Sequence, residues 1–207
     1  LRMRRKGIQV FIIAPLKGHE FYRAARNVGG EFIQISPASK NCINIMEIRK
    51  VDNSVNELLD GPTLDASALA GKIQRLHIFF SLLIPDMSHE EKQLLDEALI
   101  KTYARKGITH KNESLTDPQH PEQYKKMPIL EDVYNVLLES EDTKRLAHIL
   151  NRLVHGSASS FNQQTNVDLT NIYTVLDISE LTGSSDLLTV GMFVALDYVW
   201  DKAKENR

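Results

Sequence analysis

The segment from residue 8 to residue 37 constrains the fold most, because it has the pattern of a strand, a helix and a second strand. Residues 8–14 (IQVFIIA) form an apolar run rich in branched side chains, as in strands covered on both faces. The run ends at Pro15, which has no backbone N–H to donate to a neighbouring strand. We therefore predict a strand of a parallel sheet over 8–14.

A helix is predicted next, from the helical spacing of Phe21, Ala24, Ala25 and Val28. The pair Gly29-Gly30 ends it, since glycine adopts left-handed backbone angles without strain. Residues 32–35 resume the strand pattern. In α/β sheets ligands gather beyond the carboxyl ends of strands, so residues 15–20 (PLKGHE) are the first place to look for a site. The same six residues also suit an ordinary connection between a strand and a helix.

Composition indicates a globular protein of one or two domains, with 207 residues of which 42% are hydrophobic. A net charge of −2 gives no basic footprint over the whole chain, so any contact with nucleic acid must be local. The one dense basic cluster is Arg2, Arg4, Arg5 and Lys6, before Gly7. We favour a helix carboxyl end for this cluster over a nucleic-acid arm.

Cys42 is the only cysteine, which excludes an internal disulfide and fits a cytoplasmic, reducing compartment. No apolar run has the length of a membrane span, and no signal peptide is evident. The sequence starts at Leu1 with a basic helix end rather than at a methionine. We therefore expect the chain to be part of a longer protein.

The middle of the chain has a different character from its two ends. Residues 42–48 alternate as in a short half-buried strand or extended segment, and residues 53–66 resemble a loop. From 70 to 155 we predict four helices and no convincing strand. The first ends at Pro85, and Ser88 opens the second as a capping box with Glu91.

The remaining elements follow from similar signals. A long polar loop over 109–126 precedes a third helix with Pro128 in its first turn, and the fourth helix ends at Gly156. After a linker over 157–166, residues 173–178 have a strand pattern. Residues 187–200 are apolar nearly all round and predict a well-buried helix, whose charged continuation to residue 207 reaches solvent. The predicted fold class is α/β: a partial parallel sheet from 1–68 and 158–207, with an inserted all-α subdomain over 69–157.

None of the individual sequence motifs identifies a reaction. A phosphate-binding P-loop needs GxxxxGK followed by Ser or Thr. Gly71-Lys72 does not fit, because position 66 is Ala instead of Gly and position 73 is Ile instead of Ser or Thr. The run Thr174–Asp177 resembles a Walker B strand but lacks the following Glu, and Leu94–Glu97 belongs to an amphipathic helix. His148 and His155 lack partners arranged for zinc. We predict no catalytic residue and no metal site from these patterns.

Several segments together resemble the TraC-like conjugal transfer ATPases of type IV secretion systems, in the HerA/FtsK superfamily. They keep the family's order and cover nearly the whole chain. They are FIIAPLKGHEF (11–21), GGEFIQISPASKNCINIMEIRK (29–50), KIQRLHIFFSLLIPDMSHEEKQLLDEAL (72–99), MPILEDVY (127–134), LTNIYTVLDISEL (169–181) and VGMFVALDYVWDKAKENR (190–207).

This resemblance implies a RecA-like motor with a helical insertion, assembled into cytoplasmic hexamers that use ATP and magnesium during conjugation. Secretion-channel proteins would be direct partners, and DNA would be an indirect partner. The motor would reach the inner face of the membrane through the channel proteins. In such proteins the P-loop precedes a segment like 8–14 and the Walker B strand follows a helix like 187–207. Neither is present, so no cofactor is expected in this chain alone. The resemblance suggests Pro15, Lys17, Glu20, Asp177 and Glu180 as residues at the nucleotide edge of the sheet.

One position departs from the family pattern. Many relatives have Asp at the position of Ala14, in a DP-x-x-E-type motif, and only Pro15 and Glu20 of that motif are present. This weakens a metal role for the loop. Because parallel strands end together, we still predict residues 15–20 and 177–180 at one edge, with the three strands pairing directly or burying against a second copy. The alternative is a non-catalytic interaction module that docks channel or DNA-processing partners through its helices.

Overall fold

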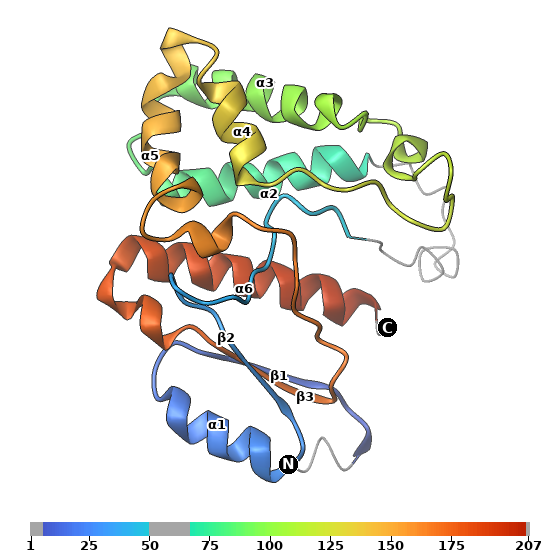
Figure 1. Ribbon diagram of the computed structural model, residues 1–207, viewed down its shortest axis with the longest axis vertical. Helices are drawn as coiled ribbons and strands as arrows, with labels where there is room; N and C mark the ends of the chain where they lie inside the picture. Colours follow the sequence, from blue (N-terminus) through green and yellow to red (C-terminus); the bar gives the residue numbers. More distant parts are fainter. Residues whose placement is uncertain (1–5, 50–66, 206–207) are drawn as a thin grey trace.

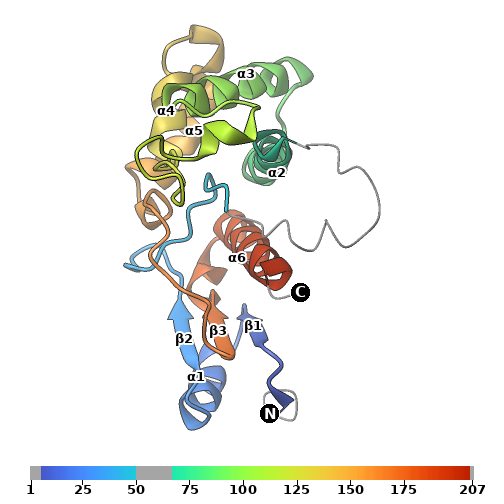
Figure 2. The same ribbon diagram turned by 90° about the vertical axis from the view of Figure 1, so that its right-hand side faces the viewer.

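The elements are stacked in successive layers, described here from a computed structural model that places residues 6–49 and 67–205. Helix α1 (Gly18–Asn27) lies on one face of a small sheet and helix α6 (Ser185–Glu205) on the other (Figure 1). Beyond α6 lies a group of four helices, which the perpendicular view also separates from the sheet (Figure 2). The sheet is therefore enclosed between helices, as an α/β fold requires.

The sheet has three parallel strands in the order β1-β3-β2. These are β1 (Val10–Ala14), β2 (Glu31–Gln34) and β3 (Tyr173–Asp177). The crossover through α1 carries the chain from β1 to β2 and leaves between them the place that β3 fills some 140 residues later in sequence. The predicted parallel pairing is confirmed, and among the described residues the strands pair directly in a small sheet.

Alternate residues of the strands face opposite helices, which explains the apolar run of β1. Ile12, Ala14 and Val175 belong to the cluster under α1. Ile13 and Leu176 pack with the larger cluster that includes α6. The prediction of a strand covered on both faces is therefore confirmed.

The four predicted central helices are present. They are α2 (Ala68–Leu83), α3 (His89–Arg105), α4 (Leu130–Leu137) and α5 (Lys144–Val154). Short 3₁₀ turns occur at η3 (Asn112–Leu115), η4 (Glu141–Thr143), η5 (Ser159–Phe161) and η6 (Ser179–Gly183). The capping box of α3 is confirmed: Ser88 Oγ accepts from the Glu91 N–H at 3.1 Å, and the Ser88 N–H donates to the Glu91 carboxylate at 2.8 Å.

Two local predictions are wrong, and a third holds only in part. Residues 42–46 are fully buried rather than half-buried and form no strand, because they run between layers and bond to the linker: Asn166 Oδ1 accepts from the Cys42 N–H at 2.7 Å. Pro128 precedes α4, whose first turn is fixed instead by the Asp132 carboxylate accepting from the Ile129 N–H at 2.9 Å. Helix α6 buries residues such as Val190, Val194 and Tyr198, as predicted, but Leu196 and Trp200 are 52% and 58% exposed.

One hydrophobic core runs from the sheet into the helical layer. It includes Leu176 of β3, Val194 of α6, Leu76 of α2 and Leu99 of α3. The division into a motor part and an inserted subdomain therefore stays a prediction. No described helix has both the length and the apolar character needed to cross a membrane. The loop predicted over 53–66 and the basic residues 2–5 lie outside the described residues.

A buried tyrosine offers a test of how the helical layer is fastened to the segment after β2. The Tyr103 hydroxyl of α3 donates to the Met46 carbonyl at 2.5 Å. Tyr103→Phe leaves that carbonyl without its partner, so we expect the free energy of unfolding in urea to fall by about 1–3 kcal/mol. The control is Tyr134→Phe, which removes the hydroxyl of a half-exposed tyrosine in α4 and should have little effect. Equal effects of the two changes would contradict this account of the contact.

Candidate functional site

The loops after all three strands begin at one edge of the sheet. Register places Ala14 and Gln34 on either side of Asp177. The Ala14 carbonyl accepts from the Ile178 N–H at 3.0 Å, and the Asp177 carbonyl accepts from the Ile35 N–H at 2.8 Å. The predicted meeting of residues 15–20 with residues 177–180 is therefore confirmed. We call Lys17, Gly18, Gln34, Asp177 and Glu180 the edge cluster.

Asp177 is the buried charged residue of the edge cluster, with 3% of its surface exposed. Its Oδ1 accepts from the Ser179 N–H at 3.0 Å. Its carboxylate also lies against the start of α1: a Cβ added at Gly18 would be 2.5 Å from Asp177 Oδ2. Glycine at position 18 thus allows the carboxylate to approach the amino end of a helix, where the helix dipole favours negative charge.

Lys17 has a left-handed backbone, with φ of 59° and ψ of 36°, and is the only described residue other than glycine with positive φ. That conformation costs a residue with a Cβ roughly 1–2 kcal/mol. It aims the chain from β1 into α1. Lys17 Nζ lies 3.9 Å from Glu20 Oε1, with both side chains more than 70% exposed, so this pair adds little stability.

Glu180 joins the edge cluster from the other side. Its Oε1 accepts from Gln34 Nε2 at 3.0 Å, which ties η6 to the end of β2. Pro15 lies in the turn after β1 and is partly exposed. Within residues 6–49 and 67–205, the edge therefore presents one buried carboxylate, exposed carboxylates and one exposed ammonium group, but no glycine-rich cradle for phosphates. These groups fit one wall of a nucleotide site rather than a whole site.

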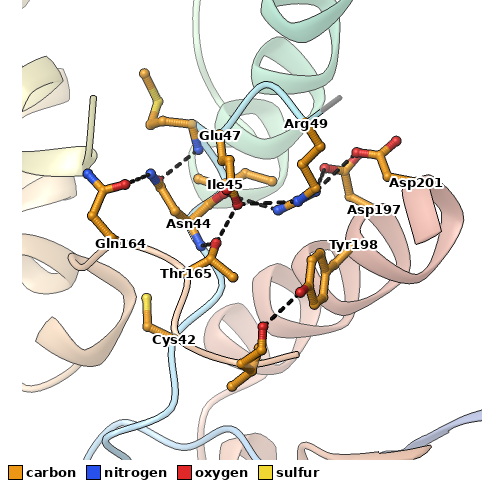
Figure 3. A network of polar contacts seen from close by, with 12 residues as sticks. Cys42, Asn44, Ile45, Glu47, Arg49, Gln164, Thr165, Asp197, Tyr198 and Asp201 are labelled. Atoms are coloured by element: carbon orange, nitrogen blue, oxygen red, sulfur yellow. Dashed lines mark hydrogen bonds and ion pairs between the residues drawn. The ribbon is translucent and has the colours of Figure 1, made fainter. Parts of the chain in front are cut away.

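A second polar site was missed by the sequence patterns. It is a buried ion network of Arg49, Lys72, Arg75, Asp197 and Asp201 where α2, α6 and the segment after β2 meet; Figure 3 shows part of it. Arg75 Nη1 donates to Asp197 at 3.0 Å and to Asp201 at 2.7 Å. Lys72 Nζ donates to Asp197 at 3.3 Å and to the Ile45 carbonyl at 3.2 Å.

Arg49 completes the network from the third segment. Its Nη1 lies 3.0 Å from Asp201 Oδ2, and its guanidinium lies 4.4 Å from the centre of the Tyr198 ring. Glu47 Oε2 is 3.3 Å from Arg49 Nε, close enough for an ion pair but not in hydrogen-bond geometry, so this buried N–H has no acceptor among the described residues. Thr165 Oγ donates to the same carboxylate at 2.5 Å.

Burial and pairing set the protonation of the network. Burial lowers the pKa of Lys72 from 10.5 to about 8, although Asp197 acts in the opposite direction. For Asp201, burial raises the pKa, but the hydrogen bond from Arg75 and the nearby cations outweigh it, so the pKa is lowered. Asp201 is therefore held as a carboxylate near neutral pH.

The prediction that the charged end of α6 reaches solvent fails at Asp201. Asp201 is only 4% exposed, because Arg49 and Arg75 surround it. The sequence did contain a signal for this buried network, because two aspartates four residues apart in an apolar helix share one face. Lys72 likewise falls between the buried residues Leu69 and Leu76 of α2.

Comparison with known proteins bears on the whole arrangement. No protein-family profile matches the sequence, and no curated protein matches it. Among solved structures, VirB4 of Thermoanaerobacter pseudethanolicus superimposes with a TM-score of 0.77 at 26% identity, over 97% of this chain and 70% of that one. The chain is similar to VirB4 over nearly its whole length. The resemblance to type IV secretion ATPases drawn from the sequence is thereby confirmed, and so is the RecA-like α/β class. The roles of individual residues in the VirB4-like chain stay predictions.

Gly18 tests whether the edge cluster depends on close packing. In the VirB4-like chain, Gly18→Ala forces a Cβ against the buried Asp177 carboxylate, so we expect a loss of about 1–3 kcal/mol in the free energy of unfolding. Gly71→Ala in α2 is the matched control: nothing lies within 4 Å of its Cβ, and alanine favours a helix by about 1 kcal/mol. If adding Asp177→Ala to Gly18→Ala restores none of the lost stability, the contact between the new Cβ and the Asp177 carboxylate is not the cause of the loss.

The depressed pKa of Lys72 predicts a pH dependence of stability. The unfolded state takes up a proton on Lys72 as pH falls through about 10.5, whereas the folded state does so only near pH 8. The contribution of Lys72 to stability therefore rises between pH 8 and 10.5 and is constant below pH 8. We expect Lys72→Met to remove this rise. The comparison is made as a difference between wild type and variant, in which the titration of other groups, such as Tyr103 and Cys42, cancels. Identical pH slopes for the two chains would rule the assignment out.

Proposed function

We propose that the VirB4-like chain is the central part of the motor of a conjugative type IV secretion ATPase, which powers DNA or protein transfer by ATP hydrolysis. The observation that carries the proposal is the 97% coverage of this chain by the VirB4 structure, together with a parallel sheet whose strand ends form one polar edge. In α/β proteins that edge is where ligands bind.

The open side of the sheet also supports this assignment. Among the described strands β1 pairs only with β3, so its outer edge has unpaired backbone groups. Helix α6, which packs over β1, exposes Leu196 and Trp200 by 52% and 58%. An unpaired strand beside an apolar helix stripe suits the addition of further strands from the same motor, and we propose that strands carrying the P-loop and Walker B motifs occupy it.

Within that motor, the chain's own residues would form one wall of the nucleotide site. Asp177 is held buried against Gly18, and the left-handed Lys17 presents its ammonium group at the rim. ATP with magnesium, when bound, supplies the phosphoryl group and its charge neutralisation. We propose that Asp177 and Glu180 orient this wall, that Lys17 attracts the nucleotide, and that Pro15 and Glu20 shape the loop.

We further propose that the 207 residues alone do not hydrolyse ATP, because the sequence has no GxxxxGK[ST] motif and no apolar strand that ends in Asp-Glu. The parent protein would act in the cytoplasm as a hexamer and reach the inner face of the membrane through secretion-channel proteins. DNA would be an indirect partner.

The test compares this chain with a longer protein from the same reading frame that includes both motifs. We expect ATP turnover by the longer protein and none by the 207 residues. Within the longer protein, Asp177→Asn should lower kcat by roughly tenfold or more, whereas Asp168→Asn, an exposed carboxylate before β3, should not.

The outcomes separate the motor from the alternative. If the reading frame contains neither motif, or if the longer protein shows no turnover, the motor proposal is wrong and a non-catalytic interaction module is favoured. If turnover occurs but Asp177→Asn leaves it unchanged, the motor stands and the role of the edge cluster is wrong.

A further inference from the structure

A pocket of about 370 Å³ lies next to the ion network. Four segments far apart in sequence enclose it: residues 47–49, 124–127, 164–165, and Tyr198 with Lys202 of α6. Its wall includes the Tyr198 ring, which Arg49 covers at 4.4 Å, and the Glu47 carboxylate, which Thr165 holds; all four are seen in Figure 3. A concave site built from four segments is a candidate for ligand binding.

The charges around the pocket do not balance. The adjoining cations Arg49, Lys72 and Arg75 are matched by Glu47, Asp197 and Asp201, with which they form ion pairs. Among the described residues, the lining also contains Lys125 and Lys126, for which no carboxylate partner is seen, and no carboxylate other than Glu47. Lys202, which already takes part in another interaction, adds to the basic side of the wall. A hollow with an excess of positive charge concentrates anions.

Its neutral polar groups are already engaged. Gln164 Nε2 donates to the Met127 carbonyl at 2.8 Å, and the Tyr198 hydroxyl donates to the Val167 carbonyl at 2.8 Å. Lys125 gives one of its three protons to the Gly107 carbonyl at 2.7 Å. The donors left for a ligand are therefore mainly ammonium groups, chief among them the exposed Lys126, for which no hydrogen bond or ion pair with a described residue is seen.

We propose that this pocket, which we call the lysine pocket, binds a phosphate-bearing anion. Ammonium groups bind phosphate as point charges, and a phosphate carries about −1.5 to −2 at neutral pH, which offsets Lys125 and Lys126 better than a single carboxylate does. The site is separate from the edge cluster: Thr165 precedes β3 and Lys202 lies in the last turn of α6, whereas Asp177 is the last residue of β3. The proposal does not depend on the motor assignment.

The experiment measures pyrophosphate binding to the 207-residue chain by calorimetry. We expect Lys126→Glu to weaken binding by roughly tenfold or more, as for loss of a charge-assisted contact. Lys202→Gln should weaken it by a smaller factor. Lys92→Glu on the exposed face of α3 changes the net charge equally and should leave binding unchanged. Circular dichroism of each variant checks the fold.

A single-stranded oligothymidylate then identifies the source of the phosphate. If it displaces pyrophosphate from the wild type and binds Lys126→Glu weakly, the pocket holds the backbone of a nucleic-acid strand; if it does not compete, the pocket holds a small phosphate compound. Either result agrees with the proposal. Absence of pyrophosphate binding by the wild type, or equal weakening by Lys126→Glu and Lys92→Glu, would overturn it.

Discussion

The buried ion network between α2 and α6 is the contact on which the arrangement of the layers depends. Buried charges are costly unless each is paired, and Asp197 and Asp201 are paired with cations from two other segments. Apolar packing alone would tolerate small shifts of one helix along another. The ion pairs of the two carboxylates do not tolerate such shifts, because a shift by one helical turn would leave several charges buried without partners. The network therefore fixes the register of α6 against α2 as well as their contact.

The parallel sheet and most helices could be predicted because their signals are local. Residues 8–14 are apolar on both faces, and Ser88 with Glu91 forms a cap within one turn. The ion network could not be found in this way, because Arg49, Lys72 and Asp197 are far apart in sequence and each resembles a surface charge on its own. The exposure of Trp200 was missed for the opposite reason: apolarity does not tell which neighbours cover a helix.

The candidate site shows the same limit. Parallel strands end together, so sequence order alone placed residues 15–20 beside residues 177–180. Sequence could not reveal that Gly18 makes room for the Asp177 carboxylate, since that contact depends on the register of β3 between β1 and β2. It also could not separate Glu20, which is exposed, from Asp177, which is buried. Burial is a property of the assembled layers.

Helix α6 joins the two polar sites mechanically. It begins just after η6, which Glu180 ties to the end of β2, and it carries Asp197 and Asp201 near its other end. A helix transmits displacement along its axis because its backbone hydrogen bonds are continuous. Since the network locks α6 to α2, any movement of the strand ends that displaces α6 must either carry α2 with it or separate buried ion pairs. The second course is costly, so we expect the sheet edge and the helical layer to move together.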